Sequence, residues 1–316
     1  MKIMICDVPN LFFRTVAAHN TKYSGSDDDK ANLALHSCLN VMNKWYNQRQ
    51  PDQIVVVFEG SKNWRKAYTS SDKCISKIPY KGNRVKDPAL EHLFQVISDF
   101  ERLARSNTSI ICLSNEQLEG DDLLAGCAIR FANEGHDVDI VSGDKDFMQL
   151  LKYDNIKLIN PDNGVARQCE DPYYFIFEKC IRGDGGDNVR SAFPRVRSTR
   201  LQKAYTDPYE MTLLMNEQWE FVNPNTLEKT TYTVKDLFEE NKLLMDLESQ
   251  PDEIKQLIQN TIDEGLSSIG KFSLFEFSKF LGQHELKHIA DNINRYVKML
   301  SCKPAIEPKR QGALIF

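Results

Sequence analysis

The chain has 316 residues, of which 41% are hydrophobic and 27% are charged, and its formal net charge is −5. This composition excludes a disordered chain and predicts one large domain, alone or with a smaller one. No apolar run approaches the roughly 18 residues of a membrane span, and residues 1–6 run directly into an acidic residue, which predicts a first strand rather than a signal peptide.

Short β-rich apolar runs alternate with helical patterns in the first half of the chain. Strands are predicted at 2–6, 54–58, 109–113, 138–142 and 156–159, and helices at 31–47, 90–106 and 121–134. This alternation predicts an α/β fold, with a mostly parallel, twisted central sheet flanked by helices on both faces. The eight cysteines occur singly, without a C-x-x-C pair, which predicts reduced thiols and a cytoplasmic location.

Two basic segments are hidden by the negative net charge. Residues 60–90 hold eight Lys or Arg against two Asp, and residues 179–203 hold seven against two. The first segment, 61–89, also carries Trp64, Tyr68 and Tyr80, which could stack on bases or pack as a small core. Because the distribution of charge matters more than its sum, the acidic total does not argue against a nucleic-acid partner.

The second half of the chain reads as helical. Helical patterns lie near 207–219, 235–249, 251–262, 272–282 and 285–299, with a strand around 229–234. We therefore expect an α/β domain over 1–185 with 61–89 as an insert, a helical region over 186–303, and a tail over 304–316.

Acidic residues follow three predicted strands and open one predicted helix. Asp7, Glu59 and Asp144 come at or just after strand ends, and Glu119 precedes a helix. In an open α/β sheet, ligands bind at the carboxyl edge of the strands. Glu119 and Asp122, three apart, should share one side of the first helical turn, and Asp144 and Asp146, two apart, should point to the same side of an extended stretch.

The acidic residues of this edge, together with two from a glycine-rich loop, form a set of nine carboxylates. They are Asp7, Glu59, Glu119, Asp121, Asp122, Asp144, Asp146, Asp184 and Asp187. Carboxylates packed this closely repel one another unless a cation lies between them, and an all-oxygen set favours Mg²⁺ or Mn²⁺ over Zn²⁺. The simpler alternative, that acids are favoured at helix N-termini, accounts for one or two of the nine.

Five motifs occur in a family-specific order: Asp7-x-x-Asn10-Leu-x-Phe-Arg14, Tyr80-Lys-Gly-Asn-Arg84, Glu119-x-Asp-Asp122, Ser142-x-Asp-x-Asp146 and Gly183-Asp-x-x-Asp-Asn188. As an ordered set over about residues 1–190 they resemble the 5′ nuclease (flap endonuclease) family, and most of all its small phage members, including the enzymes called RNase H. The resemblance implies a two-metal phosphodiesterase that acts from the 5′ ends of flaps, of nicked or gapped duplex and of RNA·DNA hybrids, and that removes RNA primers during replication.

The resemblance also implies roles for single residues. Asp7, Glu119, Asp121 and Asp144 resemble the residues nearest two Mg²⁺ ions, for which Mn²⁺ can substitute, and the other acids resemble their partners. Lys81 and Arg84, with Asp7 and Asp144, resemble the catalytic group. The residues expected to contact nucleic acid are Asn10, Arg14, Arg65, Tyr80, Arg190, Arg195, Arg197, Arg200 and Lys203.

The chain departs from the family pattern at two places. Glu59 stands where the family usually has Asp, so its longer side chain is the least certain ligand. The family normally continues with a glycine-rich helix-hairpin-helix, but residues 189–203 contain no glycine. Arginines in this stretch could replace the hairpin by direct contacts to phosphates, a sequence-independent and salt-dependent mode of binding.

Three other functions remain open. His284-Glu285-Leu-Lys-His288 matches the H-E-x-x-H pattern of zinc peptidases, which needs both histidines on one helix face. The chain could also be a non-catalytic DNA-binding module, or an RNA-cleaving PIN-type domain with acids at strand ends. The number of acids argues against the module, and the basic insert argues against a short PIN domain.

The last residues, from Gln311 to Phe316, resemble the Q-x-x-L-x-F peptides that dock proteins onto sliding clamps, with Gln311, Leu314 and Phe316 as the contact residues. A single-strand-binding protein is a second expected partner, and we expect a monomer without membrane contact. The likeness suggests a phage protein in bacterial cytoplasm. Residue patterns leave open the preference for exonuclease or flap cleavage and the order of 61–89.

Overall fold

The computed structural model describes residues 1–19, 26–84, 89–222 and 229–302. The chain divides into two compact units: unit one holds residues 1–60, 87–168 and 256–316, and unit two holds residues 61–86 and 169–255. The expected division at residue 185 differs from this one, because the insert groups with the middle of the chain and the last helices group with the sheet.

Unit one is built on a parallel sheet of five strands in the order β3-β2-β1-β4-β5. The strands are β1 (Lys2–Asp7), β2 (Gln53–Val57), β3 (Ile111–Leu113), β4 (Asp137–Val141) and β5 (Ile156–Ile159). Asp7 is in register with Val57 on one side, and Cys6 is in register with Val141 on the other. The strand order therefore reverses beside β1, and the crevice at such a switch point is where α/β sheets bind ligands.

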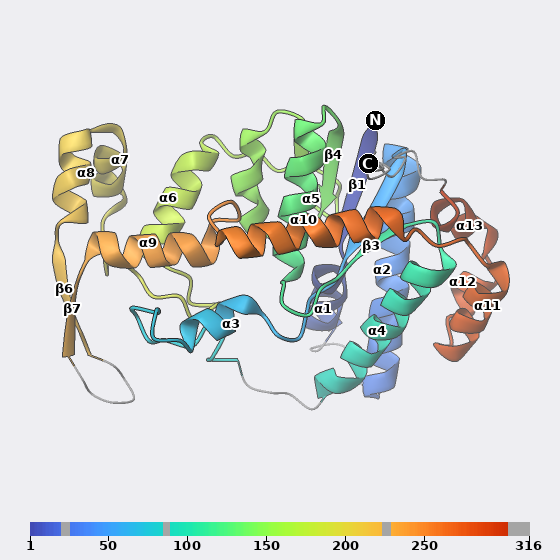
Figure 1. The fold of residues 1–316 in the computed structure, drawn as a ribbon. Helices are drawn as coiled ribbons and strands as arrows, with labels where there is room; N and C mark the ends of the chain where they lie inside the picture. The colour runs from blue at the N-terminus through green and yellow to red at the C-terminus, as the bar shows by residue number, and fades with distance from the viewer. Residues whose placement is uncertain (20–25, 85–88, 223–228, 303–316) are drawn as a thin grey trace, which may run out of the picture. The chain divides into compact units, whose positions relative to one another are not determined.

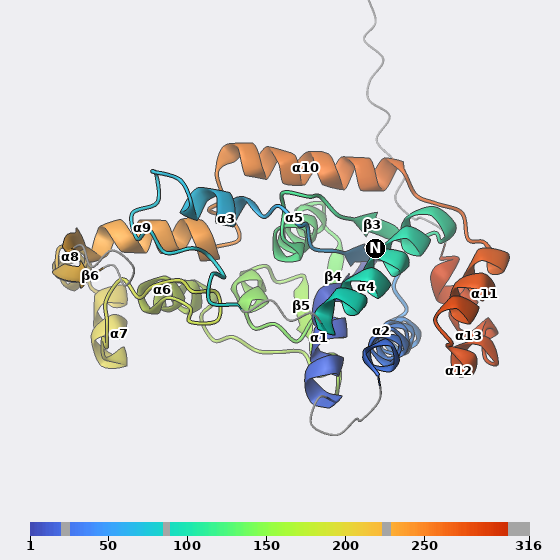
Figure 2. The same ribbon diagram turned by 90° about the horizontal axis from the view of Figure 1, so that it is seen from below.

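Helices cover both faces of this sheet, which confirms the predicted fold class. The helices of unit one are α1 (Val8–His19), α2 (Asp27–Arg49), α4 (Ala89–Asn107), α5 (Gly120–Asn133), the 3₁₀ helix η1 (Asp146–Lys152), α11 (Leu274–Gln283), α12 (Lys287–Ala290) and α13 (Asn294–Leu300). In both views α11, α12 and α13 lie together on the side of α2 and α4 (Figure 1, Figure 2).

The two faces of the sheet are buried by alternate residues of the same strands. Met4 and Cys6 belong to a core cluster with Phe12, Leu35 and Phe100 from the α1, α2 and α4 layer. Their neighbours in β1 and β2 are equally buried and therefore face the other layer, because successive side chains in a strand point to opposite faces. In that layer glycine allows close packing: a Cβ on Gly126 of α5 would lie 2.3 Å from Ile258.

Unit two is mainly helical. Its elements are α3 (Trp64–Thr69), α6 (Pro172–Arg182), α7 (Ser198–Thr206), α8 (Pro208–Met215), β6 (Gln218–Val222), β7 (Lys229–Thr233) and α9 (Val234–Met245), and it contains the start of α10 (Asp252–Ser267), which continues in unit one. Asp207 ends α7 and caps α8. β6 and β7 form the antiparallel hairpin drawn in Figure 1. The core of this unit includes Phe177, Ile181 and Leu237.

The five predicted strands are confirmed within about two residues. The helices predicted at 90–106 and 121–134 are confirmed within one residue, and the helix predicted at 31–47 is confirmed but begins four residues earlier, at Asp27. The predicted helix over 285–299 is wrong, because the chain breaks at Glu285, whose φ is 52°, and continues as two short helices, α12 and α13. The structure adds α1, α3, α6 and α7, whose short or polar patterns were not recognised. No helix among the described residues is long and apolar enough to cross a membrane.

Candidate metal and nucleic-acid site

Asp7 lies at the carboxyl end of the central strand β1 and is only 5% exposed. Its Oδ2 accepts a hydrogen bond of 2.7 Å from the hydroxyl of Ser142, which follows β4. Its Oδ1 accepts one of 3.1 Å from the backbone N–H of Asn10, and the side chain of Asn10 accepts one of 2.9 Å from the N–H of Gly143. These bonds join the ends of β1 and β4 at the switch point of the sheet.

The environment of Asp7 disfavours its negative charge. Burial, together with the nearby charges of Asp144 and Glu59, raises the pKa of Asp7 to about 6, although the hydrogen bonds from Ser142 and Asn10 oppose this rise. A buried carboxylate held beside two others is stabilised by a cation. The chemistry of these carboxylates therefore suits a divalent metal ion.

Asp144 and Asp146 belong to a turn rather than to the expected extended stretch. The backbone N–H of Asp144 donates to the Ser142 hydroxyl at 3.0 Å, and the N–H of Asp146 donates to Oδ1 of Asp144 at 2.8 Å. Asp146 then begins η1. The prediction of an extended conformation was wrong because these side-chain caps offer the backbone a turn, as Ser and Asp commonly do.

Glu119 and Asp122 share one side of the first turn of α5, as predicted. Glu119 is the N-cap and Asp122 the third helical residue, and each carboxylate accepts from the backbone N–H of the other, with 3.2 Å from Glu119 N to Asp122 Oδ2. Both side chains are buried, whereas Asp121 is partly exposed. The N–H of Gly60 donates to Leu118 O at 2.9 Å, which brings the residue after Glu59 beside the start of α5.

Within the described residues, no three His, Cys, Asp or Glu side chains are arranged as they stand to hold a metal ion. The convergence of all nine acids on one metal site therefore remains a prediction. Asp7, Glu59, Glu119, Asp121, Asp122, Asp144 and Asp146 belong to unit one, and Asp184 and Asp187 belong to unit two.

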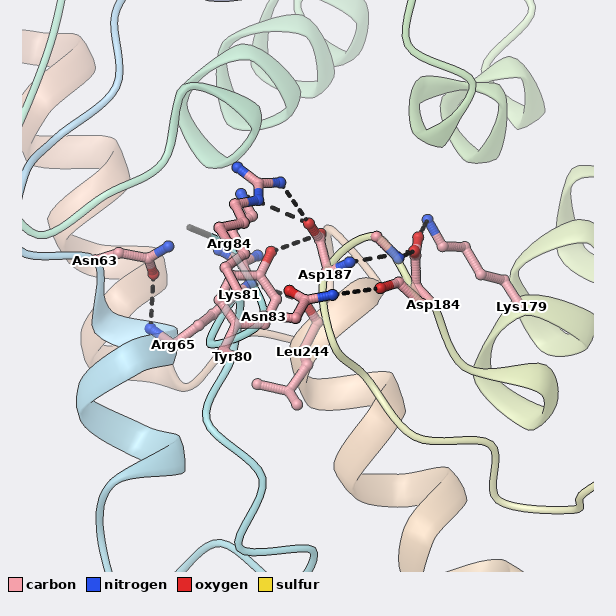
Figure 3. A network of polar contacts seen from close by, with 12 residues as sticks. Asn63, Arg65, Tyr80, Lys81, Asn83, Arg84, Lys179, Asp184, Asp187 and Leu244 are labelled. Carbon is pink, nitrogen blue, oxygen red and sulfur yellow. Dashed lines mark hydrogen bonds and ion pairs between the residues drawn. The ribbon is translucent and has the colours of Figure 1, made fainter. Parts of the chain in front are cut away.

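The two acids of unit two are held by cations and hydroxyls of that unit (Figure 3). Asp187 accepts from the Tyr80 hydroxyl at 2.8 Å and from Arg84 Nη2 at 2.9 Å, and the Lys81 ammonium lies 3.9 Å from it. Asp184 pairs with Lys179 at 3.0 Å. Burial opposes the ionisation of Asp184, but Lys179 and the backbone N–H groups of the loop lower its pKa. Lys81 and Arg84, expected in catalysis, thus lie together on the carboxylate of Asp187.

Two residues expected to contact nucleic acid are buried instead. Arg65 is 1% exposed, and its Nε donates to the carbonyl oxygen of Leu244 at 2.7 Å. Tyr80 is 5% exposed, and Trp64 is also buried. For Trp64 and Tyr80 the core alternative is correct, and Arg65 is buried with them, because α9 and the loop after α6 cover the segment that appears polar in sequence.

The other residues expected to contact nucleic acid fall into two groups: some already have a partner within the protein, and others are exposed. Arg190 stacks 3.2 Å above the Phe221 ring centroid, Arg200 is paired with Glu217, and Lys203 is paired with Glu210 at 2.6 Å. Arg195 and Arg197 are exposed. In unit one, Arg14 is paired with Asp162, and Asn10 joins the Asp7 edge as described.

Sequence reasoning missed Arg167, which contacts the loop that follows β4. Its Nη2 donates to the carbonyl oxygen of Gly143 at 3.1 Å, and its buried Nε has no hydrogen-bond partner among the described residues. The chain turns back after β5, and an isolated antiparallel bridge pairs Ala166 with Ile159. This pairing places Arg167 beside the end of β5. No signal in the sequence distinguishes this arginine from others in polar loops.

The zinc-peptidase alternative is not supported by the fold. α11 ends at Gln283, so His284 and His288 do not share one helix. His284 is buried, with its ring 3.3 Å from Asn32 Oδ1 and 3.5 Å from the carboxylate of Asp99. His288 is exposed and faces His36. The expected clamp peptide with Gln311, Leu314 and Phe316 lies outside the described residues.

Comparisons with known proteins agree with this geometry. A 5'-3' exonuclease of Buchnera aphidicola is 28% identical over 182 residues, which cover 52% of this chain and 56% of that protein, so the match spans about half of its length. Ribonuclease H of Enterobacteria phage T4 is 26% identical over 275 residues, 78% of this chain and 83% of that one.

A solved structure shows the same fold. It is the flap endonuclease of bacteriophage T5, in a pseudo-enzyme-product complex with DNA and metal ions, with a TM-score of 0.56, 18% identity, and coverage of 92% of this chain and 100% of that chain. Residues 2–176, more than half of the chain, match the family described as "5'-3' exonuclease, N-terminal resolvase-like domain". The chain therefore belongs to the 5'-3' exonuclease family of nucleases.

Proposed function

We propose that this protein hydrolyses phosphodiester bonds at the 5′ ends of branched DNA and of RNA·DNA hybrids, and so removes RNA primers and 5′ flaps during replication. The observation that carries the proposal is the buried carboxylate of Asp7 at the switch point of the sheet, with the charges of Asp144 and Glu59 beside it. Family membership supports the reaction class, and the T4 ribonuclease H and T5 flap endonuclease relatives support the substrates.

Two Mg²⁺ ions, replaceable by Mn²⁺, are the proposed cofactors. Asp7, Glu119, Asp121 and Asp144 would hold them most directly, and the remaining five predicted acids would orient their water ligands. When bound, the ions would supply Lewis acidity to the attacking water and to the phosphate oxygens. Ser142 and Asn10 hold the Asp7 carboxylate in a single orientation, so this ligand is preorganised.

The basic residues of the two units have distinct proposed roles. Lys81 and Arg84 would neutralise charge that develops on the scissile phosphate, and their present pairing with Asp187 keeps the two cations together. Asn10, Arg14 and the exposed arginines of unit two would contact the phosphate backbone of the nucleic-acid substrate.

Partners and location complete the proposal. We propose a monomer that works in bacterial cytoplasm, where the eight free thiols stay reduced, with a sliding clamp and a single-strand-binding protein as partners. The terminal peptide would dock on the clamp, so replacement of Leu314 and Phe316 by Ala should abolish stimulation by the clamp and leave cleavage of short oligonucleotides intact. Unchanged clamp binding would exclude this role.

The decisive experiment is cleavage of a 5′-labelled DNA flap and of an RNA·DNA hybrid, with and without Mg²⁺. We expect metal-dependent cleavage from the 5′ side by the wild type and its loss in Asp144→Asn. The matched control is Asp137→Asn, which changes an exposed acid at the opposite end of β4 and should cleave normally. Salt-sensitive binding to the flap without cleavage would mean that the chain is a non-catalytic DNA-binding module, and cleavage of single-stranded RNA alone would indicate a PIN-type ribonuclease.

A further inference from the structure

Unit two contains a pocket of about 670 Å³ that none of the roles above uses as a whole. It is lined by residues 193–197, by Arg200 and by Trp219. These residues come from the irregular segment before α7, from the first turns of α7 and from strand β6. The volume is in the range of sites that take one small organic group, a few hundred to a thousand Å³.

One wall of the pocket is aromatic. The rings of Phe193 and Trp219 are 5.1 Å apart between centroids and tilted by 47°. Trp219 and Phe221 alternate with outward residues in β6 and so share a face of the hairpin, but Phe221 is buried whereas Trp219 is 37% exposed. Phe193 is also buried and supports the indole from behind. An indole that is fixed on one side and open on another is a surface on which a planar base can stack.

Three arginines also line the pocket, beside the apolar Pro194 and Val196. Arg195 and Arg197 are exposed, and within the described part of the chain no acidic side chain pairs with either. Arg200 differs, since it is paired with Glu217 and its guanidinium lies 4.9 Å from the Phe193 ring centroid. Arg200 therefore stabilises the aromatic wall, and the two other arginines remain available for an anion.

The backbone at Arg195 supports a binding role. Its φ is 60°, in the left-handed region that residues other than glycine seldom adopt. Such conformations are strained and concentrate at ligand-binding sites, where the surroundings hold them. The strained residue carries one of the two available cations at the pocket.

We propose that this pocket binds one unpaired nucleotide of a single-stranded segment of the nucleic-acid substrate. The base stacks on the indole of Trp219, and Arg195 and Arg197 hold the adjoining phosphates. The inference rests on the proposed nuclease function in one respect: it assigns to that nuclease a subsite for a single-stranded part of its substrate.

Tryptophan fluorescence provides a direct test. The chain has three tryptophans, and Trp45 and Trp64 are 3% and 7% exposed, so quenching by a bound base reports Trp219. The probes are a thymidine pentanucleotide, a uridine pentanucleotide and an abasic pentamer with the same phosphates, all in EDTA so that no metal-dependent cleavage occurs. We expect both base-containing probes to quench the fluorescence and the abasic probe to bind more weakly without quenching.

Variants separate stacking from charge. Trp219→Ala should weaken binding of the thymidine pentamer by roughly five- to 150-fold, the loss expected from one base–aromatic stack, and leave the abasic pentamer unchanged, whereas Trp219→Phe should restore most of the affinity. Arg195→Gln and Arg197→Gln should weaken all three probes. Circular dichroism and the affinity for the abasic pentamer show that the Trp219 variants fold.

Three results would overturn the proposal: equal binding of abasic and base-containing pentamers, unchanged thymidine binding in Trp219→Ala, or equal competition by oligoglutamate, which would indicate an acidic peptide. The result is independent of the cleavage assay. Quenching without metal-dependent cleavage of the flap would support the nucleotide-binding pocket and contradict the proposed nuclease function. Cleavage without quenching would contradict the pocket and leave the nuclease function supported.

Discussion

Single residues of this protein differ in what folding does to their charge. Asp7 is buried at a sheet edge beside two other acids, His284 is buried beside Asp99, and Asp187 is surrounded by Tyr80, Lys81 and Arg84. In the first case folding disfavours the charged form, in the second it disfavours protonation, and in the third the neighbouring cations balance the carboxylate. The first two cases lead to testable predictions.

Asp7→Asn should stabilise the metal-free protein. The pKa of Asp7 is raised from 3.8 to about 6 in the folded state, so at pH 7 its ionisation favours the unfolded state. Asparagine keeps an acceptor for the Asn10 N–H, and we expect the free energy of unfolding in EDTA to rise by roughly 1–3 kcal/mol. Urea unfolding measures this. Added Mg²⁺ should stabilise the variant less than it stabilises the wild type. A lower free energy of unfolding of the variant in EDTA would contradict the electrostatic account. Asp137→Asn is the control.

His284 should make the fold sensitive to mild acid. Burial lowers the pKa of His284, although Asp99 opposes this, so the unfolded chain, with an ordinary pKa of about 6.5, binds the proton more tightly. The stability is therefore complete above about pH 6.5 and is lost as the pH falls towards the folded pKa. Unfolding midpoints between pH 7 and pH 5 should decline less in His284→Gln than in the wild type. Identical slopes in the wild type and in His284→Gln would exclude His284 as the cause.

At the scale of elements, the basic insert is held by buried polar groups as well as by apolar packing, in which Tyr80 lies against Leu244 and Met245. α3 contributes Arg65, which bonds to Leu244 at the end of α9. The buried carboxylate of Glu240 in α9 accepts from the N–H groups of Ile75 and Ser76. A buried charged side chain that forms hydrogen bonds fixes the path of a segment. If the segment moved away, the buried charge and its hydrogen-bond partners would be left unsatisfied.

Arg65→Ala should therefore act through stability. Removal of the guanidinium leaves the Leu244 carbonyl without this donor and a cavity beside Trp64, so we expect a loss of roughly 2–4 kcal/mol. Lys66→Ala, one residue further along the same helix and exposed, should stay within about 0.5 kcal/mol of the wild type. The measurement is urea unfolding at low and high salt. A variant of normal stability that binds DNA less well would restore the role that the sequence predicts for Arg65.

At the scale of the whole molecule, the net charge of −5 conceals opposite local charges. Acids collect at the sheet edge of unit one, and the segment 179–203 of unit two is basic. Contacts with phosphate release counterions, so the affinity for DNA should fall steeply with salt despite the acidic total.

The pairing of the basic residues predicts how much each contributes to this salt dependence. Arg197→Gln should reduce the slope of log affinity against log salt for a single-stranded DNA oligonucleotide by roughly 0.7, the value for one phosphate contact on a single strand. Lys203→Gln should reduce it less, because Glu210 already neutralises its ammonium. Binding titrations at several salt concentrations test both, and equal reductions would show that the ion pair with Glu210 opens on DNA.

The amino-acid sequence by itself determined the sheet and its acidic edge. Continuous apolar runs such as 54–58 can be buried on both faces only in a parallel sheet covered by helices, and the residues after such runs must meet at one edge. The sequence therefore places Asp7, Glu59 and Asp144 at the ends of their strands. Glu119 and Asp122 were paired by helical periodicity alone.

Only the tertiary structure decided which polar residues face solvent. Arg65 and Tyr80 read as surface residues because burial of a cation or hydroxyl depends on acceptors far along the chain, here Leu244 and Asp187. Arg167 meets the loop after β4 for the same reason. The local sequence pattern encodes the periodicity of helices and strands. Hydrogen-bond partners that are distant in sequence are brought together only by tertiary packing. Packing alone therefore distinguishes a charged side chain that is buried and paired from one that is exposed and available to a ligand.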